Sequence, residues 1–186
     1  GGADNIQLIS PTAYTKQIVV ALFEAAKNGL KLPLVHNGEG EESMLALKLL
    51  DGLVDMYIPD VKFIRPETAE RIGLSRHYPL RMKEASVEMY RQCGPLRRPS
   101  DSVEIVGVEG LLVRHLLMPE GVEEAALIFA FLNDIDNSFP LHIMTQYQPL
   151  HAAGDIPGID RHLTEEELQA AVKAVRKHRM THVYMS

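Results

Sequence analysis

The chain has 186 residues, of which 46% are hydrophobic and 24% charged, and its formal net charge is -6 at pH 7. This balance is typical of a globular protein and argues against a disordered chain. No apolar run reaches the ~18 residues of a membrane-spanning helix, so we expect no membrane partner. Because the charge is negative and no basic stripe occurs, we expect no nucleic-acid partner either. The length predicts a single domain over residues 1–186.

The beginning of the sequence and its one cysteine bear on its origin. Residues 1–6 contain no initiator Met and no secretory signal, so we expect an internal beginning, as in a fragment of a longer protein. Cys93 is the single cysteine and cannot form an internal disulfide, which favours a reducing compartment and a cytoplasmic location. We expect Cys93 to be a small buried hydrophobe, with a reactive thiol as the less favoured alternative.

Hydrophobic periodicity predicts five main strands with helices between them. The predicted strands span residues 5–9, 32–35, 54–63, 110–118 and 139–144. The predicted helices span residues 13–27, 42–50, 69–74, 80–92 and 122–132, and a last helix begins at the capping box formed by Thr164 and Glu167. Residues 103–107 are interpreted as a small excursion or hairpin arm, and residues 182–186 as a short tail or an edge strand. Strands that alternate with helices predict a parallel α/β array, either an open doubly wound sheet or part of a barrel.

The stretch from Val54 to Phe63 combines an apolar run with an acid and a base, Asp60 and Lys62. On an extended backbone these two side chains share one face with Met56 and Ile58. Apolar residues on both faces are typical of a parallel sheet covered by helices, in which ligands bind at the carboxyl ends of strands. Asp60 and Lys62 are therefore candidate ligand contacts. The alternative is a local salt bridge at the end of a strand.

Arg114 and His115 interrupt the apolar strand over residues 110–118. They point to opposite faces of that strand, and a buried guanidinium without a partner is very costly. Arg114 on the inner face could meet an anionic ligand or Asp60. His115 would then pack against the outer helices as a hydrogen-bonded neutral imidazole, a structural role that we favour over a catalytic one.

Polar side chains follow several of the predicted strands. The loop over residues 36–40 contains His36, Asn37 and two glycines, and residues 145–149 follow the last strand. Candidate site residues at many strand ends favour a barrel, where the ends meet at one mouth, over an open sheet with one switch point. No GxGxxG or GxxxxGKS/T motif follows a strand, so nucleotide sites of those types are unsupported.

Six ordered blocks of sequence resemble a known family. The blocks span residues 32–38, 50–62, 78–79, 89–96, 110–116 and 144–147, and the resemblance covers nearly the whole chain. Together they resemble the pyruvate formate-lyase activating enzyme-related branch of the radical S-adenosylmethionine (SAM) proteins. The resemblance implies an incomplete (β/α) barrel of the radical SAM type, a partial TIM barrel with about five parallel strands and its first βα unit missing.

The resemblance also implies an activity. Members of the family are oxidoreductases that hold a 4Fe-4S cluster through a CxxxCxxC loop and cleave SAM reductively to a 5′-deoxyadenosyl radical. This sequence contains no CxxxCxxC, and one cysteine cannot supply three thiolates to an iron-sulfur cluster. We therefore expect the SAM-binding portion of such an enzyme, inactive alone, with the cluster present only in the full-length protein. The implied partners are an electron donor and either a protein substrate, such as a glycyl-radical enzyme, or a small molecule.

The resemblance assigns SAM contacts to six residues. Asp60, Lys62 and Arg114 match the Asp-x-Lys and Arg that line the family's SAM pocket, where a base can bind the carboxylate and an acid the ammonium group. Asn37 resembles the Asn of the family's Asn-Gly turn. Thr12 falls where many members carry Gly-Gly-Glu, and Gln148 stands near a position where activating enzymes often place a histidine. No catalytic residue and no metal ligand is predicted.

Two other functions stay open at this point. The first is a cluster-less radical-SAM-like protein that serves as a ligand-binding or interaction module. The second is a barrel aldolase or isomerase in which Lys62 forms a Schiff base or carries a proton.

Overall fold

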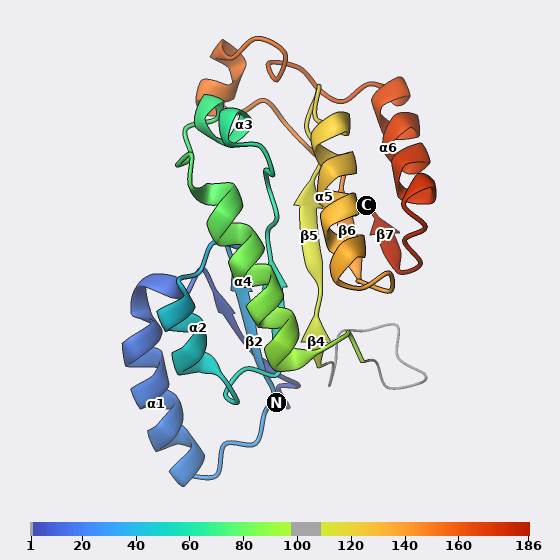
Figure 1. Ribbon diagram of the computed structural model, residues 1–186. Coiled ribbons are helices and arrows are strands. Elements are labelled where there is room, and N and C mark those ends of the chain that lie inside the picture. Colours follow the sequence, from blue (N-terminus) through green and yellow to red (C-terminus); the bar gives the residue numbers. More distant parts are fainter. Residues whose placement is uncertain (1, 98–108) are drawn as a thin grey trace. The chain divides into compact units, whose positions relative to one another are not determined.

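The computed structural model describes residues 2–97 and 109–186 (Figure 1). In this part of the chain the strands are β1 (Ile6–Ile9), β2 (Leu34–Gly38), β3 (Met56–Pro59), β4 (Gly110–Leu111), β5 (Val113–Leu116), β6 (Leu141–Met144) and β7 (Val183–Met185). The helices are α1 (Thr15–Lys27), α2 (Met44–Leu50), α3 (Pro66–Arg71), α4 (Tyr78–Cys93), α5 (Val122–Ile135) and α6 (Glu165–Lys177), with short 3-10 helices at Thr12–Tyr14 and His151–Asp155. The hairpin arm predicted over residues 103–107 lies outside the described residues.

The chain forms two compact units. The first unit comprises Gly1–Asp60 and Leu80–Val113, and the second comprises Val61–Pro79 and Arg114–Ser186. The predicted single domain over residues 1–186 stays a prediction. No helix in the described part of the chain combines the length and the apolar character needed to cross a membrane.

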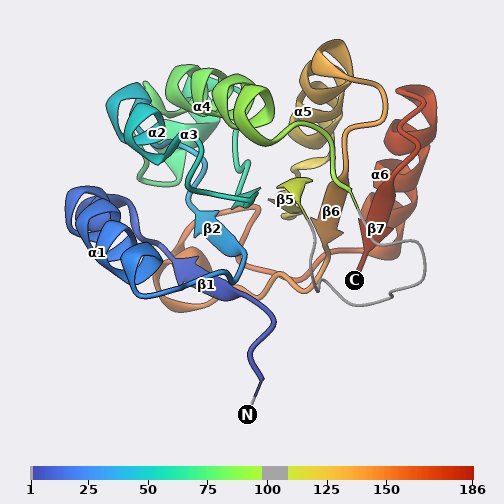
Figure 2. The same cartoon turned by 90° about the horizontal axis from the view of Figure 1, so that it is seen from below.

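The first unit contains a parallel sheet with the strand order β1-β2-β3-β4. Helices α1, α2 and α4 lie on one side of this sheet (Figure 2). Tyr57 of β3 points toward them, because its hydroxyl donates a 2.7 Å hydrogen bond to Gln92 of α4. On the opposite face, a buried apolar cluster comprises Val35, Met56, Ile58 and Leu112. Both faces of β3 are therefore buried, as predicted for a strand covered on two sides.

Two of the predicted strand boundaries are wrong. Residues 36–38, predicted as a loop, belong to β2, because they pair with β1 and β3 despite the low strand propensity of Asn and Gly. β3 ends at Pro59, so Asp60 and Lys62 follow the strand instead of lying within it. The apolar run over residues 54–63 does not indicate where pairing stops.

The strand predicted over residues 110–118 is divided between two sheets. β4 pairs with β3 in the first unit, whereas β5 belongs to a separate sheet with the order β5-β6-β7. The backbone N–H of Leu112 still donates to the carbonyl oxygen of Tyr57 at 3.0 Å. The chain therefore changes pairing partner directly after Leu112, inside one continuous apolar run.

The second unit builds its core from the β5-β6-β7 sheet and helices α5 and α6. β6 and β7 are parallel, which confirms the edge strand over the last residues. Helix α5 buries a stripe that includes Ile128, Phe129 and Leu132, and α6 buries Ala171 and Ala174. The predicted capping box opens α6. Both units thus consist of parallel strands with helices, which confirms an α/β fold, while closure into a barrel stays a prediction.

Candidate functional site

Three of the six predicted site residues lie at one edge of the first unit's sheet. β1, β2 and β3 are parallel, so their carboxyl ends form a common edge. Thr12 follows β1, Asn37 is the fourth residue of β2, and Asp60 is the first residue after β3. Asn37 is opposite Ile9 of β1 and Ile58 of β3, and its side chain is buried, whereas Asp60 is half-buried. The fold therefore gathers a hydroxyl, an amide and a carboxylate at this edge.

The turn after β2 fixes the backbone at Asp60. The N–H of Asp60 donates a 3.0 Å hydrogen bond to the carbonyl oxygen of Gly38. Gly40 has a φ of 82°, and a Cβ at this position would overlap the carbonyl oxygen of Asp60. Only glycine combines this backbone conformation with such a close approach. The segment from Gly38 to Gly40 therefore holds the backbone of Asp60, the residue that follows β3, in place.

A buried imidazole and carboxylate, His36 and Glu42, lie at the same end of β2. Thr12 Oγ1 donates to Glu42 Oε1 at 3.4 Å, and a Cβ at Gly38 would overlap this same oxygen and crowd His36. Within the described residues, neither ring nitrogen of His36 has a hydrogen-bond partner. Its ring lies 5.3 Å from that of Tyr57, measured between centroids.

Burial determines the charge state of this pair. It lowers the pKa of His36 to about 4, so the imidazole is neutral near neutral pH. It also raises the pKa of Glu42, while hydrogen bonds to the backbone and to Thr12 act in the opposite direction. The sequence prediction missed the pair, since His36 was placed in a loop. The available signal was a His and a Glu flanking a turn with two glycines.

The other three predicted site residues belong to the second unit. Lys62 is half-buried, and its backbone N–H donates to the Tyr78 hydroxyl at 2.9 Å. Arg114 is half-buried in β5, and its carbonyl oxygen accepts the Val61 N–H at 2.8 Å. Gln148 is exposed and follows β6. That all six residues contact one ligand stays a prediction.

His115 has the structural environment that its sequence context predicts. It is 3% exposed, its Nδ1 lies 2.8 Å from the carbonyl oxygen of Val61, and its ring packs edge-on against Phe129 of α5. A carbonyl only accepts hydrogen bonds, so Nδ1 carries the proton. Burial lowers the pKa of His115, which keeps the ring neutral. The hydrogen-bonded neutral imidazole against the helices is confirmed.

Glu124 of α5 is a buried carboxylate. The sequence prediction placed it in the first turn of a helix and gave it no further role. Its Oε1 accepts the backbone N–H groups of Ile64 and of Arg65, the latter at 2.8 Å, and its Oε2 accepts the Thr68 hydroxyl at 3.3 Å. These groups lie at the beginning of α3. Because the first N–H groups of a helix have no partner within it, Glu124 caps α3 from another helix. Its role is structural.

The residues of this chain do not fit an iron-sulfur cluster. Cys93 Sγ lies 3.3 Å from the carbonyl oxygen of Val54, and burial raises the pKa of the thiol to about 12. Cys93 is packed against this carbonyl group but is only partly buried, so the predicted burial is confirmed in part. Among residues 2–97 and 109–186, no three His, Cys, Asp or Glu side chains are grouped so that they could hold a metal ion.

Comparison with known proteins identifies a relative by sequence and similarity to solved structures. No family model matches the chain. An uncharacterized protein of Methanocaldococcus jannaschii is 28% identical over 176 residues, and the match covers 94% of this chain and 46% of that protein. The chain therefore spans less than half the length of this relative.

One of the similar solved structures is a domain of pyruvate-formate lyase-activating enzyme from Bacteroides vulgatus. It matches with a TM-score of 0.65 and 9% sequence identity, and the alignment covers 99% of both chains. At an identity this low, the similarity shows the fold alone. The chain has the fold of a pyruvate-formate lyase-activating enzyme domain, which confirms at the level of the fold the resemblance seen in its sequence.

Proposed function

We propose that this chain is the SAM-binding portion of a radical SAM oxidoreductase similar to pyruvate formate-lyase activating enzyme. In the full-length protein, SAM would be cleaved reductively to a 5′-deoxyadenosyl radical, and the 4Fe-4S cluster would be held by residues outside this sequence. The chain alone is then inactive. The observation that carries the proposal is the shared fold, together with Thr12, Asn37 and Asp60 at one carboxyl edge of a parallel sheet.

The chemistry of this edge fits the methionine end of SAM. Its ammonium group needs acceptors, and the Asp60 carboxylate, Thr12 hydroxyl and Asn37 amide oxygen are acceptors at the end of the sheet. Gly38 and Gly40 carry no side chain at this edge, whereas Glu39 between them is exposed and accepts a 3.3 Å hydrogen bond from the Ser10 hydroxyl. We assign the methionine carboxylate of SAM to Lys62 and Arg114, and the adenosine to Gln148, on the resemblance of the sequence.

The proposal gives this chain a binding role and no chemical step. One packed cysteine cannot hold the cluster, so electron transfer to SAM requires residues from elsewhere. An electron donor and a substrate, either a glycyl-radical protein or a small molecule, are proposed as partners of the full-length enzyme.

Reconstitution tests the division of roles. The chain is incubated with iron, sulfide, a reductant and SAM, and both the absorption of a 4Fe-4S cluster and the formation of 5′-deoxyadenosine are measured. We expect neither signal, while SAM binding is retained. A cluster spectrum or 5′-deoxyadenosine from this chain alone would overturn the proposal that it is only the binding portion.

A further inference from the structure

Glu42 is a buried carboxylate at the carboxyl edge of the first unit's sheet, and the proposed function gives it no role. It is 2% exposed, and its Oε2 is buried without a hydrogen-bond partner among the described residues. Its Oε1 accepts the Thr12 hydroxyl at 3.4 Å. Because Thr12 is exposed, Glu42 lies on the protein side of a predicted SAM contact.

The end of β2 leaves room for this carboxylate. A Cβ at Gly38 would overlap Glu42 Oε1, so a residue without a side chain is needed beside it. The same Cβ would crowd the ring of His36. Burial lowers the pKa of His36 to about 4, so this ring is neutral near neutral pH and does not balance the charge of the carboxylate.

The protein groups around Glu42 supply hydrogen bonds but no cation. Burial is the largest cause of its raised pKa, and Glu39 raises the pKa further, whereas backbone N–H groups and Thr12 lower it. Tyr57, which also faces this carboxylate, stays protonated, because burial raises the pKa of its hydroxyl. A buried carboxylate without a cation is costly. A cationic ligand at this edge of the sheet would offset that cost.

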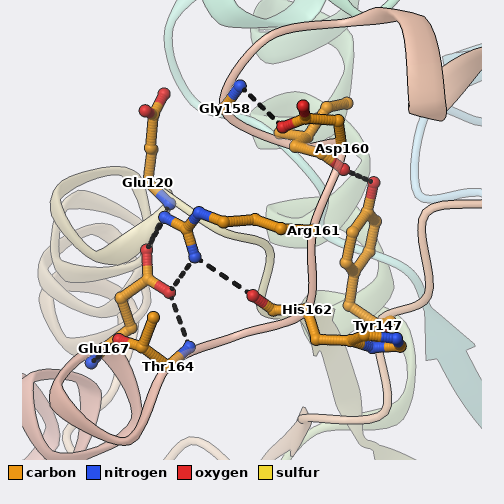
Figure 3. Close-up of polar contacts among 9 residues, drawn as sticks. Glu120, Tyr147, Gly158, Asp160, Arg161, His162, Thr164 and Glu167 are labelled. Atoms are coloured by element: carbon orange, nitrogen blue, oxygen red, sulfur yellow. Dashed lines mark hydrogen bonds and ion pairs between the residues drawn. The ribbon is translucent and has the colours of Figure 1, made fainter.

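Glu167 shows how a carboxylate is satisfied when its role is structural (Figure 3). Arg161 donates to both of its oxygens, at 2.8 and 2.9 Å, and the backbone N–H groups of Thr164 and Glu120 donate at 2.9 and 2.8 Å. The hydrogen bond from Arg161 lowers the pKa of Glu167 to about 2. Glu42 has neither a guanidinium partner in the described part of the chain nor a lowered pKa.

The direction of the hydrogen bond from Thr12 decides what a ligand meets at this hydroxyl. A carboxylate only accepts hydrogen bonds, so Thr12 donates its proton to the ionised Glu42. The lone pairs of the Thr12 oxygen are then left to accept from a ligand, and the negative charge behind the hydroxyl attracts a cation. An ammonium group has both the donors and the positive charge that this arrangement favours.

We propose that Glu42 is a positioning residue for the ammonium group of SAM and acts on it through the Thr12 hydroxyl. The inference rests on the proposed function, because it concerns the same edge of the sheet. It adds the recognition of the α-amino group: Glu42 keeps Thr12 an acceptor and supplies a buried negative charge. The carboxylate itself stays buried and does not contact SAM.

Titration calorimetry tests the proposal with two probes, SAM and the SAM analogue that lacks the α-amino group. Glu42→Gln keeps the shape of the side chain and removes its charge, so it should weaken SAM binding about tenfold and leave the affinity for the analogue unchanged. A merely structural role would weaken both ligands alike. The control is Glu41→Gln, since Glu41 pairs with Arg81 at 3.6 Å, and this variant should bind both probes like the parent chain.

Thr12→Val provides a second variant, which removes an exposed hydroxyl. It should also weaken SAM binding about tenfold and leave the analogue unaffected. The double variant should lose no more than either single one, because Glu42 acts through Thr12. The role of Glu42 would be overturned by unchanged SAM affinity in Glu42→Gln, by equal losses for the two probes, or by additive losses in the double variant. Absence of SAM binding by the parent chain would overturn the proposed function and this inference with it.

Discussion

The Gly40 backbone approaches the carbonyl oxygen of Asp60 so closely that no side chain fits between them. Gly40 also has a φ of 82°, in the left-handed region that favours glycine. Since the Asp60 N–H bonds to Gly38, the turn and the acid form one rigid element. The position of the proposed SAM-binding carboxylate thus depends on a residue that has no side chain.

Gly40→Ala should lower the free energy of unfolding by about 2–3 kcal/mol, because it combines a strained backbone with a displaced Asp60. The control is Gly52→Ala. Gly52 has a φ of 76° but no heavy atom near its Cβ position, so it should lose about 1 kcal/mol from strain alone. Urea denaturation measures both losses. Equal losses would show that the approach to Asp60 contributes nothing.

The neighbouring acids Glu123 and Glu124 provide a test of the cap on α3. Glu124→Ala should cost about 3 kcal/mol, because it leaves the N–H groups of Ile64 and Arg65 without their acceptor. Glu123 is exposed and contacts Arg65 only at 3.5 Å, so Glu123→Ala should leave stability nearly unchanged. Chemical denaturation compares the two variants. Similar effects would mean that Glu124 does not act as a cap.

The buried His36 should make stability depend on pH. Its pKa in the folded chain is about 4, below the ordinary value of 6.5, so between these values the unfolded chain binds a proton that the folded chain does not. The contribution of His36 to folding stability is therefore complete above pH 6.5 and is lost as the pH falls toward about 4. Burial raises the pKa of Glu42. The contribution of this carboxyl group to folding stability is therefore present at low pH and is lost as the pH rises.

The variant that tests this dependence is His36→Phe, which keeps an aromatic ring beside Tyr57. Between neutral pH and about pH 5, the fall in unfolding free energy should be smaller in the variant by about 2 kcal/mol. The exposed His77 provides the control, since His77→Phe should retain the whole decrease. Urea denaturation at the two pH values gives the comparison. If His36→Phe loses as much stability as the parent chain, His36 is not the titrating group.

Elements with a local signal could be predicted from the sequence. The capping box of Thr164 and Glu167 forms as its spacing indicates, because both bonds connect residues in one helical turn. The neutral structural role of His115 followed from its place among apolar residues. The carboxyl-edge positions of Asn37 and Asp60 followed from the order of strands, because parallel strands end at the same side, whereas Thr12 was assigned by the family resemblance alone.

Features that depend on distant partners could not be predicted. Leu112 lies in a uniform apolar run, and nothing in that run marks the change from one sheet to the other. The cap that Glu124 provides to α3 joins groups about sixty positions apart in the chain. His36 was assigned to a loop because Asn and Gly follow it, yet pairing on both sides extends the strand to Gly38. In each case tertiary pairing decided the outcome.

Titration calorimetry of SAM into the chain tests the central claim most directly. The parent chain should bind SAM, and Asp60→Asn should weaken binding about tenfold, as expected when a charged hydrogen bond to the ammonium group is lost. Asp134→Asn, which changes an exposed acid on α5, should bind like the parent. Absence of SAM binding by the parent, or equal affinity of the Asp60→Asn and Asp134→Asn variants, would contradict the account.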